Sequence, residues 1–172
     1  MTTVTNEIPY HFEIAVSPEE IDFMGHVNNA FYLTWVQEAV LAHWRSIASP
    51  DEVNAHLWVA LQHEIKYLRP TFLGDIVCLT VRLKNFQGAR AFYEILIKRS
   101  QDILAEVKSS WCCIDAQTLR PTRLAREVVE RFTQRPHGRH KTSAAKISDG
   151  QTGLTKTIST KLRNEDGSEL GQ

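Results

Sequence analysis

The feature that most constrains the fold is a series of four strand-like segments joined by short connections. These segments are rich in aliphatic and aromatic residues and span residues 58–68, 76–84, 91–99 and 103–114. Connections this short join antiparallel neighbours, because a parallel pair needs a crossover of about a dozen residues or more. An earlier segment, 10–16, places apolar residues at alternate positions and predicts a fifth strand.

A long apolar segment, residues 30–47, separates the first strand candidate from the other four. Its few polar residues predict a largely buried helix, with Asn28 and Asn29 as N-cap candidates and Pro50 as the residue that ends it. A short closing helix is expected over 124–132. The element order predicts an α+β fold, in which a five-stranded antiparallel sheet wraps around one long buried helix.

The composition divides the chain into two parts. Residues 1–133 have the makeup of one globular domain. Residues 134–172 lack aromatic side chains and carry seven Lys or Arg against four Asp or Glu, which predicts a polar, disordered tail. Over the whole chain 20 basic residues balance 20 acidic ones, so charge gives no reason to expect a nucleic acid partner.

Cysteine usage and hydropathy indicate a cytoplasmic protein that does not insert into a membrane. The three cysteines show no disulfide spacing, and no apolar segment approaches the roughly 18 uncharged residues of a membrane span. The stretch from His63 to Tyr67 begins like the zinc motif His-Glu-x-x-His but ends in tyrosine. We therefore expect no metal and no cofactor.

The chemistry is concentrated just before the predicted helix, in residues 22–29. The first N–H groups of a helix have no partner within the helix and could polarise a carbonyl oxygen. Asp22 is placed to attack that carbonyl or to take a proton from water. Gly25 would permit close approach of a substrate, and His26 with the two asparagines could hold water or the carbonyl. The same residue types are common turn formers, so spacing alone also allows an ordinary loop.

Several motifs together resemble the hotdog-fold acyl-CoA thioesterases of the 4-hydroxybenzoyl-CoA thioesterase type. They are Asp22-Phe-Met-Gly-His-Val-Asn-Asn29 with Tyr32, Lys66-Tyr-Leu-Arg-Pro70, Gly74-Asp-Ile-Val77, and Trp111-Cys-Cys-Ile-Asp115 before Arg120-Pro121. The resemblance covers roughly residues 8–133. It implies hydrolysis of an acyl-CoA, with the aspartate as nucleophile or general base and the N–H groups of about Asn28 to Ala30 polarising the thioester.

The motif is also similar to that of plant acyl-carrier-protein thioesterases, which have an asparagine where this chain has Met24. A strand glutamate of those enzymes would fall at or near Glu64. Another hotdog branch carries its carboxylate on the helix, which nominates Glu38 as a rival. The resemblance implies a substrate-binding set formed by Gly25, His26, Asn28, Asn29, Tyr32 and Glu64.

Two other functions stay open, namely a non-catalytic acyl-CoA sensor and a hotdog hydratase or dehydratase. The hydratase would need an Asp/His dyad, and the spacing of Asp22 and His26 alone gives no reason to pair them. An unpaired sheet edge favours a homodimer or homotetramer. The candidates for binding CoA phosphates are Lys66, Arg69, Arg90 and Arg99.

Overall fold

The computed structural model describes residues 2–3 and 8–132. The strands are β1 (Thr2–Thr3), β2 (Tyr10–Ala15), β3 (His56–Tyr67), β4 (Ile76–Gln87), β5 (Arg90–Arg99) and β6 (Asp102–Asp115). The helices are the 3₁₀ turn η1 (Pro18–Glu20), α1 (Asn29–Ile47), α2 (Pro50–Ala55) and α3 (Arg126–Arg131). The segment 134–172 lies outside the described residues, so the disordered tail and its boundary stay predictions.

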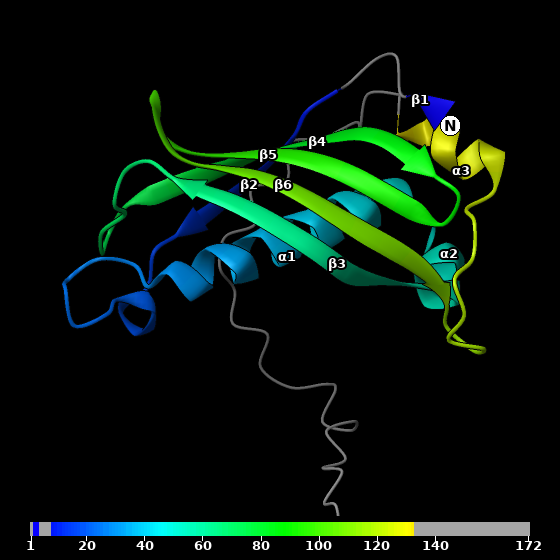
Figure 1. Ribbon diagram of the computed structural model, residues 1–172, viewed down its shortest axis with the longest axis horizontal. Helices are drawn as coiled ribbons and strands as arrows, with labels where there is room; N and C mark the ends of the chain where they lie inside the picture. Colours follow the sequence, from blue (N-terminus) through cyan, green and yellow to red (C-terminus); the bar gives the residue numbers. More distant parts are fainter. Residues whose placement is uncertain (1, 4–7, 133–172) are drawn as a thin grey trace, which may run out of the picture.

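The strands form one antiparallel sheet, and Figure 1 shows α1 lying against one of its faces. The order is β1-β4-β5-β6-β3, and β2 also pairs with β4, through residues 76–81 of that strand. The five predicted strands and the long helix are therefore confirmed. The two-residue strand β1, which pairs with Asn85 and Phe86 of β4, was not predicted.

The sheet has an apolar face and a charged face, because successive side chains of a strand point in opposite directions. Val81, Ile95 and Val107 are neighbours across β4, β5 and β6, and all three are buried on the side of α1. One residue away, Glu94 and Lys108 are neighbours on the opposite face. This alternation explains why the segments could be recognised as strands in the sequence.

Helix α1 is buried on the side that faces the sheet and exposed on the other side. Its buried residues are Tyr32, Trp35, Val36, Ala39, Val40, His43 and Trp44. The side chain of Asn28 caps the helix by accepting a hydrogen bond from the Ala30 N–H at 2.9 Å, as its N-cap position predicted. Thr34, Gln37 and Glu38 are exposed in the single chain.

The sequence expectation was incomplete around Pro50. This proline does follow the end of α1, but it also begins α2, since proline lacks only an N–H that a first helical residue does not use. The Ser49 hydroxyl accepts from the Glu52 N–H, and the Glu52 carboxylate accepts from the Ser49 N–H, which completes a capping box. The closing helix is shorter than expected and begins at Arg126.

Strand β3 is an edge of the sheet. Within the described residues it pairs only with β6, and its apolar side chains Leu57, Val59 and Leu61 are 45%, 44% and 48% exposed. A long apolar edge is a site at which another strand can add. None of the helices in the described residues is long and apolar enough to span a membrane.

Candidate active site

The candidate site is the loop that leads from η1 into α1, at the opposite end of α1 from α2 and α3 (Figure 1). Ile21 and Val27 form an isolated antiparallel bridge, and inside it the Asp22 N–H donates to the His26 carbonyl at 2.9 Å. Gly25 has a φ of +81°, which favours glycine. A Cβ atom added there would meet nothing within 4 Å, so the turn conformation is what calls for glycine.

The Asp22 carboxylate lies within this loop with 13% of its side chain exposed. Its Oδ1 accepts the Met24 N–H at 2.8 Å, which fixes the orientation of the carboxylate. Its Oδ2 lies 3.6 Å from the Nδ1 of His26. Sequence spacing provided no reason to pair these two side chains, and the tight turn brings them together. Oδ2 is thus the oxygen that remains available for chemistry.

The start of α1 supplies the second element of the site. The Asn28 N–H is occupied by the carbonyl of Glu20 at 2.9 Å, and the Ala30 N–H by the Asn28 side chain. Within the described part of the chain, the N–H of Asn29 has no hydrogen-bond acceptor. Of the three N–H groups predicted to polarise a carbonyl, this one is free to do so.

The end of β3 and the connection to β4 form hydrogen bonds with the loop and with the start of α1. The Val27 N–H donates to the Thr71 carbonyl at 2.8 Å, and the Thr71 hydroxyl is hydrogen-bonded to the Tyr32 hydroxyl at 2.8 Å. The Tyr67 hydroxyl donates to the Asn29 carbonyl at 3.1 Å. Tyr32 is buried, and burial raises its pKa. In the single chain, the predicted substrate-binding residue Tyr32 thus braces the start of the helix.

Sequence reasoning missed Glu20, the last residue of η1, which is 8% exposed. Its Oε1 accepts the Trp35 Nε1–H at 2.7 Å and its Oε2 accepts the Ser17 N–H at 2.9 Å. Glu20 belongs to a Ser-Pro-Glu-Glu stretch that is typical of a simple turn. The capping-box spacing of Ser17 and Glu20 was the available signal.

The two rival carboxylates lie elsewhere. Glu64 lies opposite Lys108 in the register of β3 and β6, on the face of the sheet that points away from α1. Within a single chain it is therefore not next to Asp22. Glu38 is exposed on α1, and its pKa is raised by partial burial and then by the negative charge of Glu20.

The four candidate cations for CoA phosphates divide into two pairs. Arg69 donates to Asp102 at 2.9 Å, and Arg99 donates to Asp75 at 2.7 Å. Both are therefore engaged by carboxylates. No ion pair joins Lys66 or Arg90 to another residue of the described part of the chain, so these two remain the more available cations.

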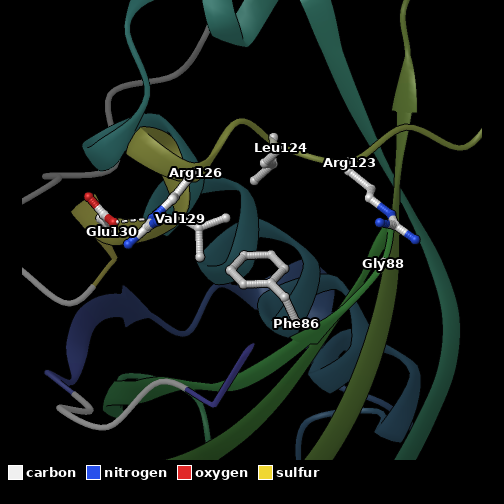
Figure 2. Close-up of a pocket in the computed structure, with 7 residues that line it drawn as sticks. All are labelled: Phe86, Gly88, Arg123, Leu124, Arg126, Val129 and Glu130. Atoms are coloured by element: carbon white, nitrogen blue, oxygen red, sulfur yellow. Dashed lines mark hydrogen bonds and ion pairs between the residues drawn. The ribbon is translucent and has the colours of Figure 1, made fainter. Parts of the chain in front are cut away.

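A separate cavity lies away from the loop site. Figure 2 shows this cavity of about 610 Å³ between the β4–β5 turn and α3, where Phe86, Leu124 and Val129 line it together with Arg123 and Arg126. Arg126 is held by Glu130 at 2.7 Å. This cavity lies near the end of α1 that is far from the loop (Figure 1). The candidate site is therefore assigned from the chemistry of the loop residues and not from a cavity. In the described ranges, no group of three or more His, Cys, Asp or Glu side chains is arranged to hold a metal ion.

Comparisons with known proteins give a consistent result. The sequence model of the thioesterase-like superfamily matches residues 16–132. The chain is 28% identical over 129 residues to the long-chain acyl-CoA thioesterase FadM of Escherichia coli (strain K12), covering 71% of this chain and 96% of FadM.

Two solved structures have a similar fold and 26% sequence identity. The first is a thioesterase of Thermus thermophilus complexed with coenzyme A and Zn, with a TM-score of 0.62, covering 71% of this chain and 95% of that one. The second is the probable thioesterase YbaW of Escherichia coli, with a TM-score of 0.60, covering 72% of this chain and 96% of that one. The similarity supports the predicted fold class.

Proposed function

Because the chain belongs to the thioesterase-like superfamily, as its motifs and element order together predicted, we propose that it hydrolyses an acyl-CoA thioester to a carboxylic acid and CoA. The relatives support this substrate class, since one is a long-chain acyl-CoA thioesterase and another was crystallised with coenzyme A. Exposed apolar side chains at the tip of the loop, Phe23 and Met24, offer a surface suited to an acyl chain.

The observation that carries the proposal is that one loop carries both the Asp22 carboxylate and, where it enters α1, an unoccupied backbone N–H. The Met24 N–H holds Oδ1 and leaves Oδ2 open. The Asn29 N–H, at the positive end of a 19-residue helix, is suited to accept the negative charge that develops on a thioester oxygen. A base or nucleophile and an oxyanion donor are the two groups that thioester cleavage requires.

The reaction can proceed by either of two routes. As general base, Asp22 takes a proton from water while the water oxygen attacks the carbonyl carbon, and the Asn29 N–H stabilises the oxyanion. The carbon–sulfur bond then breaks, and CoA leaves as a thiolate that regains the proton. As nucleophile, the Asp22 carboxylate displaces CoA to form an anhydride, which water then hydrolyses. His26 is close enough to Oδ2 to orient the carboxylate in both routes.

The contact between Asp22 and His26 also favours a second function, a hydratase or dehydratase acting on a β-hydroxyacyl-CoA. Such an enzyme needs a carboxylate and an imidazole that move protons together, and these groups lie 3.6 Å apart. The two functions are separated by the product. A hydratase would consume a 2-enoyl-CoA without releasing free thiol, whereas a thioesterase releases CoA thiol from a saturated acyl-CoA. Binding without turnover would indicate a sensor.

The test is a measurement of CoA thiol release from acyl-CoAs of different chain lengths and from an aromatic acyl-CoA. Wild-type protein should hydrolyse at least one of them steadily. Asp22→Asn keeps the shape of the loop and should lower turnover at least about a hundredfold, with little change in melting temperature. Glu38→Gln and Glu64→Gln are matched controls, and each should lower turnover less. Near wild-type turnover by Asp22→Asn would remove Asp22 from the mechanism.

A further inference from the structure

Glu20 is a buried carboxylate that bonds to three separate parts of the structure. Its Oε1 accepts from Trp35, two turns into α1, and its Oε2 accepts from the Ser17 N–H before η1. Its backbone carbonyl accepts from the N-cap residue Asn28 at 2.9 Å. The residue therefore joins the η1 turn, the body of α1 and the start of α1, which are the elements that bound the loop.

A carboxylate is needed at residue 20 because two N–H donors, of Trp35 and Ser17, each require an acceptor oxygen. No ion pair joins Glu20 to a cation among the described residues, and burying a charge against neutral donors alone is costly. A glutamine could accept from Trp35 with its oxygen, but it would present an NH₂ group to the Ser17 N–H. Only an acceptor at both positions satisfies the two donors at once.

These contacts determine which N–H is left for a substrate. Since the Glu20 carbonyl occupies the Asn28 N–H and the Asn28 side chain occupies that of Ala30, the Asn29 N–H is the one left open. Asp22 is two residues from Glu20 in the chain and directly follows Ile21, which bridges to Val27. The positions of both Asp22 and Asn29 therefore depend on where Glu20 holds the two ends of the loop.

We propose that Glu20 is a positioning residue for thioester hydrolysis, holding the Asp22 carboxylate in place relative to the Asn29 N–H. The inference rests on the proposed function. Because the described contacts of the Glu20 carboxylate go to Trp35 and Ser17 and not to the Asp22 carboxylate, its removal should reduce kcat more than it changes KM. The loss arises from poor alignment of reacting groups, to which rates are sensitive.

The chain contains a matched control for this proposal. Ser49-Pro-Asp-Glu52 repeats the Ser-Pro-acidic-Glu pattern of residues 17–20, and the Glu52 carboxylate likewise accepts from the Ser49 N–H, at 2.8 Å. Glu52, however, lies at the other end of α1 and is paired with Arg131. Glu52→Ala should thus disturb the same local motif and lower the melting temperature without reaching the loop.

The experiment compares Glu20→Ala, Glu20→Gln, Trp35→Phe and Glu52→Ala, measuring KM and the kcat corrected for the folded fraction. Glu20→Ala should lower kcat at least about tenfold with KM within about threefold, the scale of a misaligned group. Glu20→Gln keeps the Trp35 contact and should recover part of the loss. Trp35→Phe keeps the ring packing but loses the donor, so it should show a smaller fall. Glu52→Ala should keep kcat within about twofold.

Amide hydrogen exchange provides a readout separate from turnover. In Glu20→Gln, exchange should increase over residues 21–28, and in Glu52→Ala it should not. Wild-type kcat in folded Glu20→Ala, or an equal fall in Glu52→Ala, would overturn the positioning role. If the alanine variant does not fold, full kcat in both Glu20→Gln and Trp35→Phe would do the same. Failure of the wild-type protein to hydrolyse any acyl-CoA would instead overturn the proposed function.

Discussion

At the scale of single residues, the burial of His43 should make the stability of the protein depend on pH. It is 3% exposed, its ring stacks on Tyr10 at 5.1 Å and packs edge-on against Phe132 at 5.4 Å, and its Nδ1 has no described hydrogen-bond partner. Burial lowers its pKa from the usual 6.5 to about 4. The unfolded chain therefore binds a proton at a higher pH than the folded chain does.

The free energy of unfolding should consequently fall as the pH drops from 6.5 to 4, by roughly 3 kcal/mol from this one group. Urea denaturation at a series of pH values measures the change. His43→Leu should remove this component, so the difference between wild type and variant should shrink or reverse at low pH. His56→Leu is the control, because His56 is only half-buried and its Nδ1 is hydrogen-bonded to the Glu52 carbonyl. Parallel pH curves for wild type and His43→Leu would contradict the prediction.

At the scale of elements, Arg131 supplies the polar contacts between helix α3 and the C-terminal end of α1, beside the apolar packing of Val128 and Phe132. Arg131 donates to the Ile47 carbonyl at 3.1 Å and to the Glu52 carboxylate, which lowers the pKa of Glu52 to about 2. Arg131→Leu should destabilise the protein by about 1–3 kcal/mol, the usual cost of a lost charged hydrogen bond. The stabilisation by the Glu52 carboxylate is present above pH 4.5 and is lost as the pH falls toward 2. The variant should lose part of this acid dependence, because the Ser49 N–H still donates to the carboxylate.

Thermal unfolding at neutral and acidic pH measures both effects. Arg131→Lys is the control, because a lysine keeps the charge but lacks the forked donor geometry that reaches both acceptors. It should be intermediate at neutral pH. An unchanged melting temperature in Arg131→Leu would mean that α3 docks through its apolar residues, such as the buried Val128.

At the scale of the whole molecule, the exposed edge of β3 leads us to propose a homodimer or a larger homo-oligomer. The 12-residue strand has unpaired backbone groups along one side and a run of half-exposed apolar side chains. A second copy that pairs with this edge would cover both features, and closed two-fold pairing is the commonest outcome. Sedimentation at micromolar concentration should show no monomer in the wild-type protein.

Val59→Lys places a charge on this edge and should shift the sedimentation coefficient toward that of a monomer. Leu119→Lys is the control, since Leu119 is also apolar, is 64% exposed and lies in the turn after β6 rather than on the edge strand. It should leave the assembly intact. A wild-type protein that sediments as a monomer at this concentration would contradict the proposed interface.

The sequence was sufficient for the parts of this protein that depend on local periodicity. The strands of the sheet could be predicted because alternate residues such as Ile95 and Ile97 are buried while their neighbours face outward. The long helix could be predicted from its apolar length and the Asn28 cap, and the family from its motifs together with the element order. The short helix α2 was missed because proline can mark the end of one helix as easily as the start of another.

Only the tertiary structure decided how the loop is built. That Asp22 lies beside His26, that Asn29 retains a free N–H, and that Glu20 reaches Trp35 across 15 residues of chain follow from where the sheet, η1 and α1 meet. It also placed Glu64 on the far face of the sheet from α1. The physical reason is range: burial patterns and caps act over a few residues and leave a trace in the sequence, whereas side-chain hydrogen bonds between separate elements depend on packing that no local pattern records.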